Sequence, residues 1–159
     1  MTYGFLSRFP AGLRSRLFVV MGLATRAMTL GVKAFVTDGE RVLLVRHTYV
    51  TGWHLPGGGV ERGETVWSAV EKEVREETNV RLDGRPELFG VYLNGTTSRF
   101  DHIALFVCRN WREPAPFEPN AEIAECRWFG VDDLPDGTTK ATRDRVAEVL
   151  DGWAVSERW

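Results

Sequence analysis

Four of the glutamates between Gly58 and Val80, a stretch that begins in a run of glycines, have a spacing suited to chemistry: Glu64, Glu73, Glu76 and Glu77. The last three are three and four residues apart, so a helix over 64–78 would carry them on one face. Clustered carboxylates repel one another and require a positive partner. Oxygen ligands of this kind favour Mg²⁺ or Mn²⁺ over zinc. The spacing therefore indicates a metal site at the edge of a helix.

The residues around these acids are suited to holding them in place. Thr65 is expected to cap the helix, and Asn79 to end it in the left-handed conformation. The glycine run at 57–59 lets the backbone approach a ligand closely and offers a carbonyl oxygen. An apolar stripe should dock the helix on a core; it comprises Val66, Trp67, Val70 and Val74.

A simpler interpretation is a solvent-exposed acidic helix with ion pairs four residues apart. Glu71 with Arg75, and Lys72 with Glu76, would form such pairs. This interpretation leaves the glycine run and the offset of Glu64 unexplained. A metal site accounts for both, so it is preferred.

The stretch resembles the Nudix box, whose pattern is Gly-x5-Glu-x7-Arg-Glu-apolar-x-Glu-Glu-x-Gly-apolar. Two positions depart, because Lys72 replaces the arginine and Asn79 replaces the closing glycine. Arginine presents a planar fork and lysine a point charge, so Lys72 should orient the acids less rigidly. The resemblance covers about residues 31–150, including the lead-in 53–61 and the later segment 122–129. The matching positions are Gly58, Glu64, Glu73, Val74, Glu76, Glu77 and Val80.

The resemblance implies a hydrolase that uses Mg²⁺ or Mn²⁺ to cleave nucleoside diphosphates linked to another group. Glu64 and Lys72 would orient the ligands. Glu122 would be a further metal ligand or the general base, the alternative being a loop acid that faces water. The backbone carbonyl of Gly57 or Gly58 is a further candidate ligand. By motif position the metal-binding side chains are Glu73, Glu76 and Glu77.

Candidate substrate contacts lie outside the box. Arg46, at the end of an expected strand, would contact a phosphate or be a surface cation. Aromatic side chains would flank a nucleobase or belong to the core or its rim, and for His102 a structural role is preferred. These aromatic candidates are Trp53, His54, Tyr92, Phe100 and His102.

The range of possible substrates is narrowed only by family signatures that the sequence lacks. Some branches of the family carry a short sequence signature for their substrate. The signatures for NADH, dinucleoside polyphosphates, ADP-ribose and coenzyme A do not occur at their expected positions in this sequence. A nucleoside triphosphate or a nucleotide sugar is therefore favoured. A catalytically silent binding module is the alternative, although the complete set of acids argues for a hydrolase. An isomerase of allylic diphosphates ranks lower, because neither Cys108 nor Cys126 has an evident role in it.

Length and composition set the broad class of the protein. A chain of 159 residues with a net charge of −2 is expected to form one domain and not to bind nucleic acid in bulk. Its two cysteines are expected to be buried free thiols in a reducing cytoplasm. A homodimer is expected only by analogy with the family.

Residues 1–30 form an N-terminal extension ahead of the expected Nudix domain at 31–159. Arginines at 8, 14 and 16 precede the apolar run 17–24. A helix packed on the domain or on a partner subunit is preferred over a helix on a membrane surface and over a signal peptide. The apolar run is too short to span a bilayer.

The remaining pattern predicts a sheet with helices on both sides, and the resemblance implies an α/β/α sandwich with a mixed β-sheet. Asp38 and Gly39 predict a hairpin turn between paired strands. A final helix is expected over 140–153, with an apolar face that ends at Trp153. The loop at 112–120 should be extended because it contains three prolines. Strands are expected over 31–36, 41–46, 87–93, 102–108 and 127–131.

Overall fold

The computed structural model describes residues 22, 27–95 and 98–159. Two helices of the domain are α2 (Val66–Thr78) and α3 (Lys140–Leu150). The strands are β1 (Thr29–Val36), β2 (Arg41–His47), β3 (Arg81–Leu82), β4 (Glu87–Leu93), β5 (Asp101–Cys108), β6 (Trp111–Arg112) and β7 (Ile123–Gly130).

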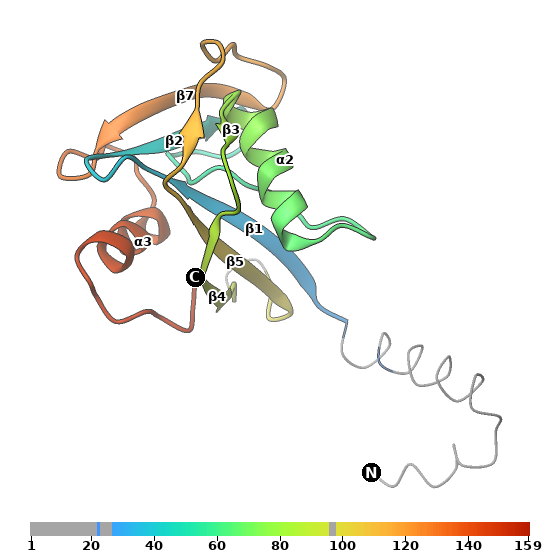
Figure 1. The fold of residues 1–159 in the computed structure, drawn as a ribbon. Helices are drawn as coiled ribbons and strands as arrows, with labels where there is room; N and C mark the ends of the chain where they lie inside the picture. Colours follow the sequence, from blue (N-terminus) through green and yellow to red (C-terminus); the bar gives the residue numbers. More distant parts are fainter. Residues whose placement is uncertain (1–21, 23–26, 96–97) are drawn as a thin grey trace, which may run out of the picture.

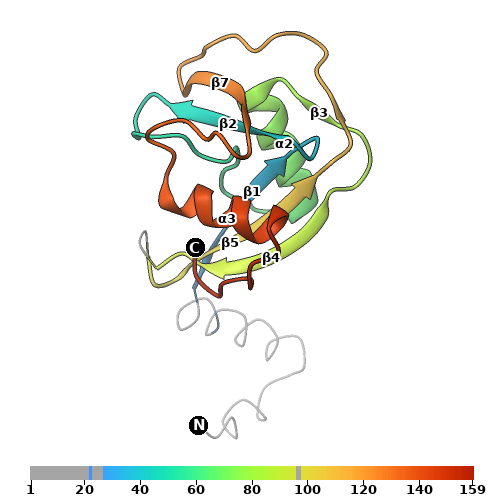
Figure 2. The ribbon, with the colours of Figure 1, turned by 90° about the vertical axis from the view of Figure 1, so that its left-hand side faces the viewer.

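The central sheet has the strand order β1-β5-β4 and lies between the two helices. Strand β5 runs parallel to β1 and antiparallel to β4, so the sheet is mixed. Val32, Ala34 and Val36 of β1 pack with the apolar side of α2, whereas Phe35 packs in a second cluster that contains Val146 of α3. Figure 2 shows α3 in front of the sheet and α2 behind it. The expected α/β/α sandwich with a mixed sheet is confirmed.

The prediction that strands 31–36 and 41–46 pair with each other is wrong. Strand β1 pairs with β5, and β2 pairs with β7. The turn itself forms, because Asp38 accepts the backbone N–H groups of Glu40 and Arg41, and Thr37 bridges Val42. Turn chemistry is local, and the two strands separate beyond it because each is buried on both faces in a different sheet.

Helix α2 begins and ends as its sequence predicts. The Thr65 hydroxyl accepts the Ser68 N–H at 3.1 Å, and the Ser68 hydroxyl accepts the Thr65 N–H at 3.0 Å. Asn79 follows the helix with φ 61°, in the left-handed conformation. Its side-chain amide also donates a hydrogen bond to the Ala115 carbonyl at 2.9 Å. A glycine at this position could end the helix but could not make this contact.

The C-terminal part departs from expectation at two places. Helix α3 stops at Leu150, and Trp153 is 64% exposed instead of continuing the apolar face. Gly152 has φ 69°, a conformation that ends a helix. Strand β7 begins at Ile123, four residues before the predicted start, because its early residues pair with the end of β2. Val146, Val149 and Leu150 do pack on the core.

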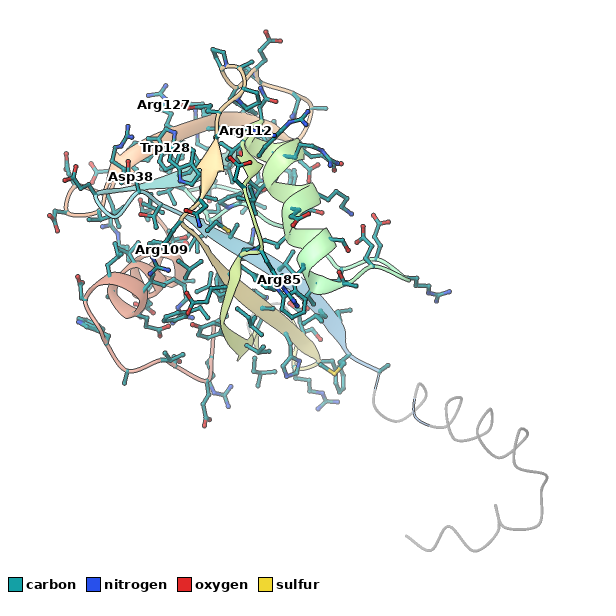
Figure 3. The ribbon with its side chains drawn as sticks, in the orientation of Figure 1. Asp38, Arg85, Arg109, Arg112, Arg127 and Trp128 are labelled. Carbon is teal, nitrogen blue, oxygen red and sulfur yellow. The ribbon has the colours of Figure 1, made fainter. Side chains whose placement is uncertain are left out.

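The two ends of the β2–β7 ladder differ in chemistry. At the Arg41 end, the Arg41 guanidinium lies 5.3 Å from the centre of the Trp128 ring, which stacks on Trp111 at 4.4 Å. Figure 3 shows Trp128 and Asp38 in this region. His47 lies at the other end of β2, six residues or about 20 Å away. The aromatic and basic cluster is therefore separate from the acidic box.

The predictions about residues 1–30 fall almost entirely outside the described residues. Within the described part of the chain, no helix is both long and apolar enough to cross a membrane. Cys108 and Cys126 are free thiols, as predicted; Cys108 is buried and Cys126 is half-buried.

Candidate active site

Three elements converge where β2 ends, α2 ends and β7 begins (Figure 1). They bring together His47, Glu77 and Glu122, which each offer one ligand atom within 4.8 Å of the others. Glu77 comes from the last turn of α2 and Glu122 directly precedes β7. Residues distant in the sequence thus form one polar cluster.

Glu77 is the most buried acid of the box, with 4% of its surface exposed. Its Oε2 accepts the Gly57 N–H at 2.7 Å. Burial raises the pKa of Glu77 to about 7, although the Lys33 ammonium partly opposes this shift. The site therefore holds a carboxyl group that titrates near neutral pH.

Lys33 is a site residue that the sequence analysis did not identify. Its ammonium donates to the carbonyls of Gly57 at 2.7 Å and Leu55 at 2.9 Å. Burial lowers the pKa of Lys33, while Glu77 and Glu73 act in the opposite direction. The available signal was a lysine in the middle of the apolar run 31–36, because lysine is rarely buried without a partner.

Glu73 lies directly against the glycine run. A Cβ atom added to Gly58 would come within 2.7 Å of Glu73 Oε2, so only glycine leaves room for this carboxylate. Burial also raises the pKa of Glu73. Gly57 has φ 138°, and a Cβ there would lie 2.1 Å from the Val32 carbonyl. The glycines of the box thus fit its acids and β1 closely.

Lys72 pairs across the loop before α2. Its ammonium lies 3.1 Å from Glu64, 3.3 Å from Glu61 and 3.6 Å from Glu73. The hydrogen bond to Glu64 raises the pKa of Lys72 above its usual value. Glu64 also accepts the Glu61 N–H at 2.9 Å, and this backbone bond lowers the pKa of Glu64. Lys72 therefore lies between Glu64 and Glu73.

Glu76 and Glu122 are the two exposed acids of the set. Glu76 lies on the same helix as Glu73 and Glu77, and its Oε1 is 2.9 Å from Arg75. Glu122 accepts the Tyr49 hydroxyl at 3.2 Å. The Asn120 side chain accepts the Glu122 backbone N–H, which fixes the start of β7. Glu122 thus reaches the cluster from the solvent side.

Arg46, Trp53, His54 and Phe100, four of the candidate substrate contacts, lie in different settings. Arg46 forms an ion pair with Glu125 and lies 5.9 Å from the centre of the Trp53 ring. Trp53 is 9% exposed and packs in the core against Phe129. The His54 ring is 5.7 Å from the His47 ring, so His54 borders the cluster.

Phe100 is the candidate placed farthest along the central sheet. It is 51% exposed and precedes Asp101, which pairs with Thr29. Lys33 lies four positions along the same ladder, about 13 Å away. Asp101, the next residue, lines one pocket together with the glycine run at 57–59, so Phe100 borders that side of the run and not the Glu77 cluster.

Comparison with known proteins identifies the family to which this chain belongs. The family pattern described as "NUDIX domain" matches residues 28–150. The chain belongs to the Nudix family of pyrophosphohydrolases. It is 31% identical over 117 residues to a "MutT-like protein" of Streptomyces ambofaciens, a match that covers 74% of this chain and 73% of the relative.

Two further relatives show how wide the family is. The "NAD-capped RNA hydrolase NudC" of Pseudomonas syringae pv. syringae (strain B728a) is 36% identical over 103 residues, which are 63% of this chain but 35% of that protein. A crystal structure of the MutT NUDIX hydrolase from Burkholderia pseudomallei aligns with a TM-score of 0.65 and 29% identity. That alignment covers 76% of this chain and 97% of the other. These matches show the family and the enzyme class of this chain. They do not select one substrate, because the relatives carry different names.

Nudix enzymes typically use a divalent metal, and the residues of this site fit one. Glu77 and Glu122 offer oxygen atoms close together. The Nε2 of the buried His47 side chain lies 4.0 Å from Glu77 Oε1, too far for a hydrogen bond. An unpaired buried polar atom beside carboxylates is suited to a cation more than to an apolar core.

The affinity of the site for Mg²⁺ should depend on pH through Glu77. Because its pKa is about 7, Glu77 holds a proton below neutral pH that a cation must displace. We expect Mg²⁺ to bind about tenfold more weakly at pH 6 than at pH 8, measured by calorimetry. The Glu122→Gln variant is the control, because it keeps Glu77 and should show the same dependence. An equal affinity of the unaltered protein at both values would contradict the role of Glu77.

Replacing Lys33 should show how much of the negative charge of Glu77 and Glu73 its ammonium neutralises. Lys33→Met removes the donor of two carbonyls and the cation beside Glu77, so the metal-free protein should lose about 1–3 kcal/mol of unfolding free energy at pH 8. Saturating Mg²⁺ should raise the melting temperature of the variant more than that of the unaltered protein, because the dication replaces the lost charge. Equal increases would show that Lys33 does not neutralise the site.

Proposed function

We propose that this Nudix enzyme hydrolyses a phosphoanhydride bond of a nucleoside diphosphate derivative with Mg²⁺ or Mn²⁺. A nucleoside triphosphate or a nucleotide sugar is the favoured substrate. The observation that carries the proposal is the placement of Glu77 and Glu73 against the glycine run, with Lys33 behind it. A purely structural helix would not need buried carboxylates there.

Each residue has a role that follows from its surroundings. Glu73, Glu76 and Glu77 hold the cation, whereas the carbonyls of Gly57 and Gly58 already accept the Lys33 ammonium and the Val32 N–H. When bound, the dication neutralises the charge that develops on the diphosphate and makes water a better nucleophile. Lys72 and Glu64 orient Glu73, since Lys72 contacts both.

Glu122 is proposed as the general base. It is exposed at the mouth of the cluster, and its carboxylate is near that of Glu77. From there it can accept a proton from the attacking water and release it to solvent. The Tyr49 hydroxyl, which donates to Glu122, would hold the carboxylate toward the site.

A hydrolysis screen with product identification by mass tests the function. The panel should contain nucleoside triphosphates, nucleotide sugars, dinucleotides and, because a relative is named as a hydrolase of NAD-capped RNA, a capped and an uncapped RNA. We expect Mg²⁺-dependent release of phosphate, pyrophosphate or a phosphate ester from a small nucleotide. Isotopically labelled water should place its oxygen on one phosphorus only.

The same screen separates the hydrolase from a silent binding module. A module would hold a nucleotide tightly and return it unchanged after incubation with Mg²⁺. If both Glu76→Gln and Glu77→Gln still turn over the substrate, the assignment of Glu76 and Glu77 as metal ligands is contradicted.

A further inference from the structure

His47 is a buried polar side chain that the box does not account for. Only 8% of its side chain is exposed. Neither ring nitrogen makes a hydrogen bond among the described residues: Nδ1 is buried without a partner, and Nε2 is the atom that faces Glu77. Most buried polar atoms in proteins are paired, so an unpaired imidazole nitrogen requires an explanation.

The contacts around His47 do not supply a structural role. The rings of Tyr49 and His54 lie 5.2 Å and 5.7 Å from its own, which are ring contacts and not hydrogen bonds. Its Nε2 is 4.0 Å from Glu77 Oε1, too long for a hydrogen bond. Two ligands of one small cation, each about 2.1 Å from it, lie about 3–4 Å apart. The Nε2 atom is therefore placed like a ligand of an ion that Glu77 also holds.

We propose that His47 supplies a nitrogen ligand to the cation held by Glu77, which gives this site a mixed nitrogen and oxygen ligand set. The proposal rests on the proposed metal-dependent hydrolysis and goes beyond the acidic residues of the box. Imidazole binds first-row transition metals in preference to Mg²⁺. His47 therefore biases the enzyme toward Mn²⁺.

The charges around the imidazole are compatible with this role. Glu77 and Glu122 face it with oxygen atoms. Lys33 is the opposing cation, and its ammonium is bound to the Gly57 and Leu55 carbonyls. An additional neutral ligand adds affinity without adding to the repulsion among the carboxylates.

Electron spin echo spectroscopy of the Mn²⁺-loaded full chain tests the proposal directly, because it detects ¹⁴N nuclei bonded to the ion. We expect a directly coordinated nitrogen signal in the unaltered protein and in His54→Gln. The signal should be lost in His47→Phe, which keeps a ring but removes the nitrogen atoms. Mn²⁺ affinity, measured by calorimetry, should fall about tenfold or more in His47→Phe, and Mg²⁺ affinity less than about threefold.

The outcomes separate this proposal from the proposed function. If Mn²⁺ binds and no nitrogen is coordinated, or if the signal disappears in His54→Gln instead, the role of His47 is overturned while the acidic metal site stands. If Mn²⁺ does not bind at all, both the role of His47 and the metal-dependent function are overturned. Circular dichroism of His47→Phe shows whether the variant is folded, and the coordinated nitrogen in the unaltered protein is decisive in either case.

Discussion

Replacing Glu77 with glutamine is expected to reduce hydrolysis by at least about 10³-fold, because it removes the charge of a buried metal-binding oxygen. The measurement is kcat at saturating Mg²⁺ with the substrate found in the screen. Glu122→Gln is the matched contrast, since it removes a proposed base. It should lower kcat by about 10²–10⁴-fold with Mg²⁺ affinity nearly unchanged, whereas Glu77→Gln should lose both.

The same Glu77→Gln variant should be more stable than the unaltered metal-free protein at pH 8. The pKa of Glu77 is about 7 in the folded state and 4.5 in the reference state, so the folded state binds more protons between these values. Stability from this group is therefore lost as pH rises from 4.5 to 7. We expect the variant to gain about 1–3 kcal/mol at pH 8 and about a quarter of that at pH 5, measured by urea unfolding.

His47 changes the free energy of unfolding with pH in the direction opposite to Glu77. The effect of Glu77 must therefore be measured as the difference between the unaltered protein and Glu77→Gln. Burial lowers the pKa of His47 from 6.5 to about 4, so its contribution to stability increases as pH rises between these values. Both proteins contain His47, and their difference isolates Glu77. A variant that is less stable than the unaltered protein at pH 8 would show that Glu77 is held for folding and not for function.

Gly58→Ala is expected to lower hydrolysis by about 10²-fold while the protein stays folded. The new methyl group would meet the Glu73 carboxylate at 2.7 Å, and this flexible side chain must move away. Displacing a positioned group by about 1 Å commonly costs about that factor in rate. The measurements are kcat and the melting temperature.

Gly59→Ala is the matched control for this substitution. It adds the same methyl group one residue later, where nothing lies within 4 Å of the new Cβ. Activity within about twofold of the unaltered enzyme is expected, since surface changes of this kind have small effects. Equal losses in both variants would mean that the loop backbone, not the position of Glu73, limits the reaction.

The box was predictable because its chemistry is local. The Thr65 cap, the left-handed Asn79 and the helical spacing of Glu73, Glu76 and Glu77 all depend on neighbours within a few residues. The pairing of β1 and β2 was not predictable from the Asp38 turn, because burial on both faces decided the partners.

The residues missed were those brought to the box by tertiary structure. His47 ends a strand whose partner, β7, also positions Glu122, and sequence alone does not pair these strands. Lys33 reaches the glycine run from β1 across a long stretch of chain. Its burial within an apolar strand was the one local signal that could have revealed it.

A crystal structure with Mn²⁺ and a non-hydrolysable nucleoside diphosphate analogue would show whether the clustered carboxylates hold an ion against a diphosphate. We expect anomalous density at about 2.1–2.3 Å from Glu77 and neighbouring carboxylate oxygens, bridged to the diphosphate of the analogue. Density for the analogue elsewhere on the protein, with no ion beside Glu73, Glu76 or Glu77, would contradict this expectation.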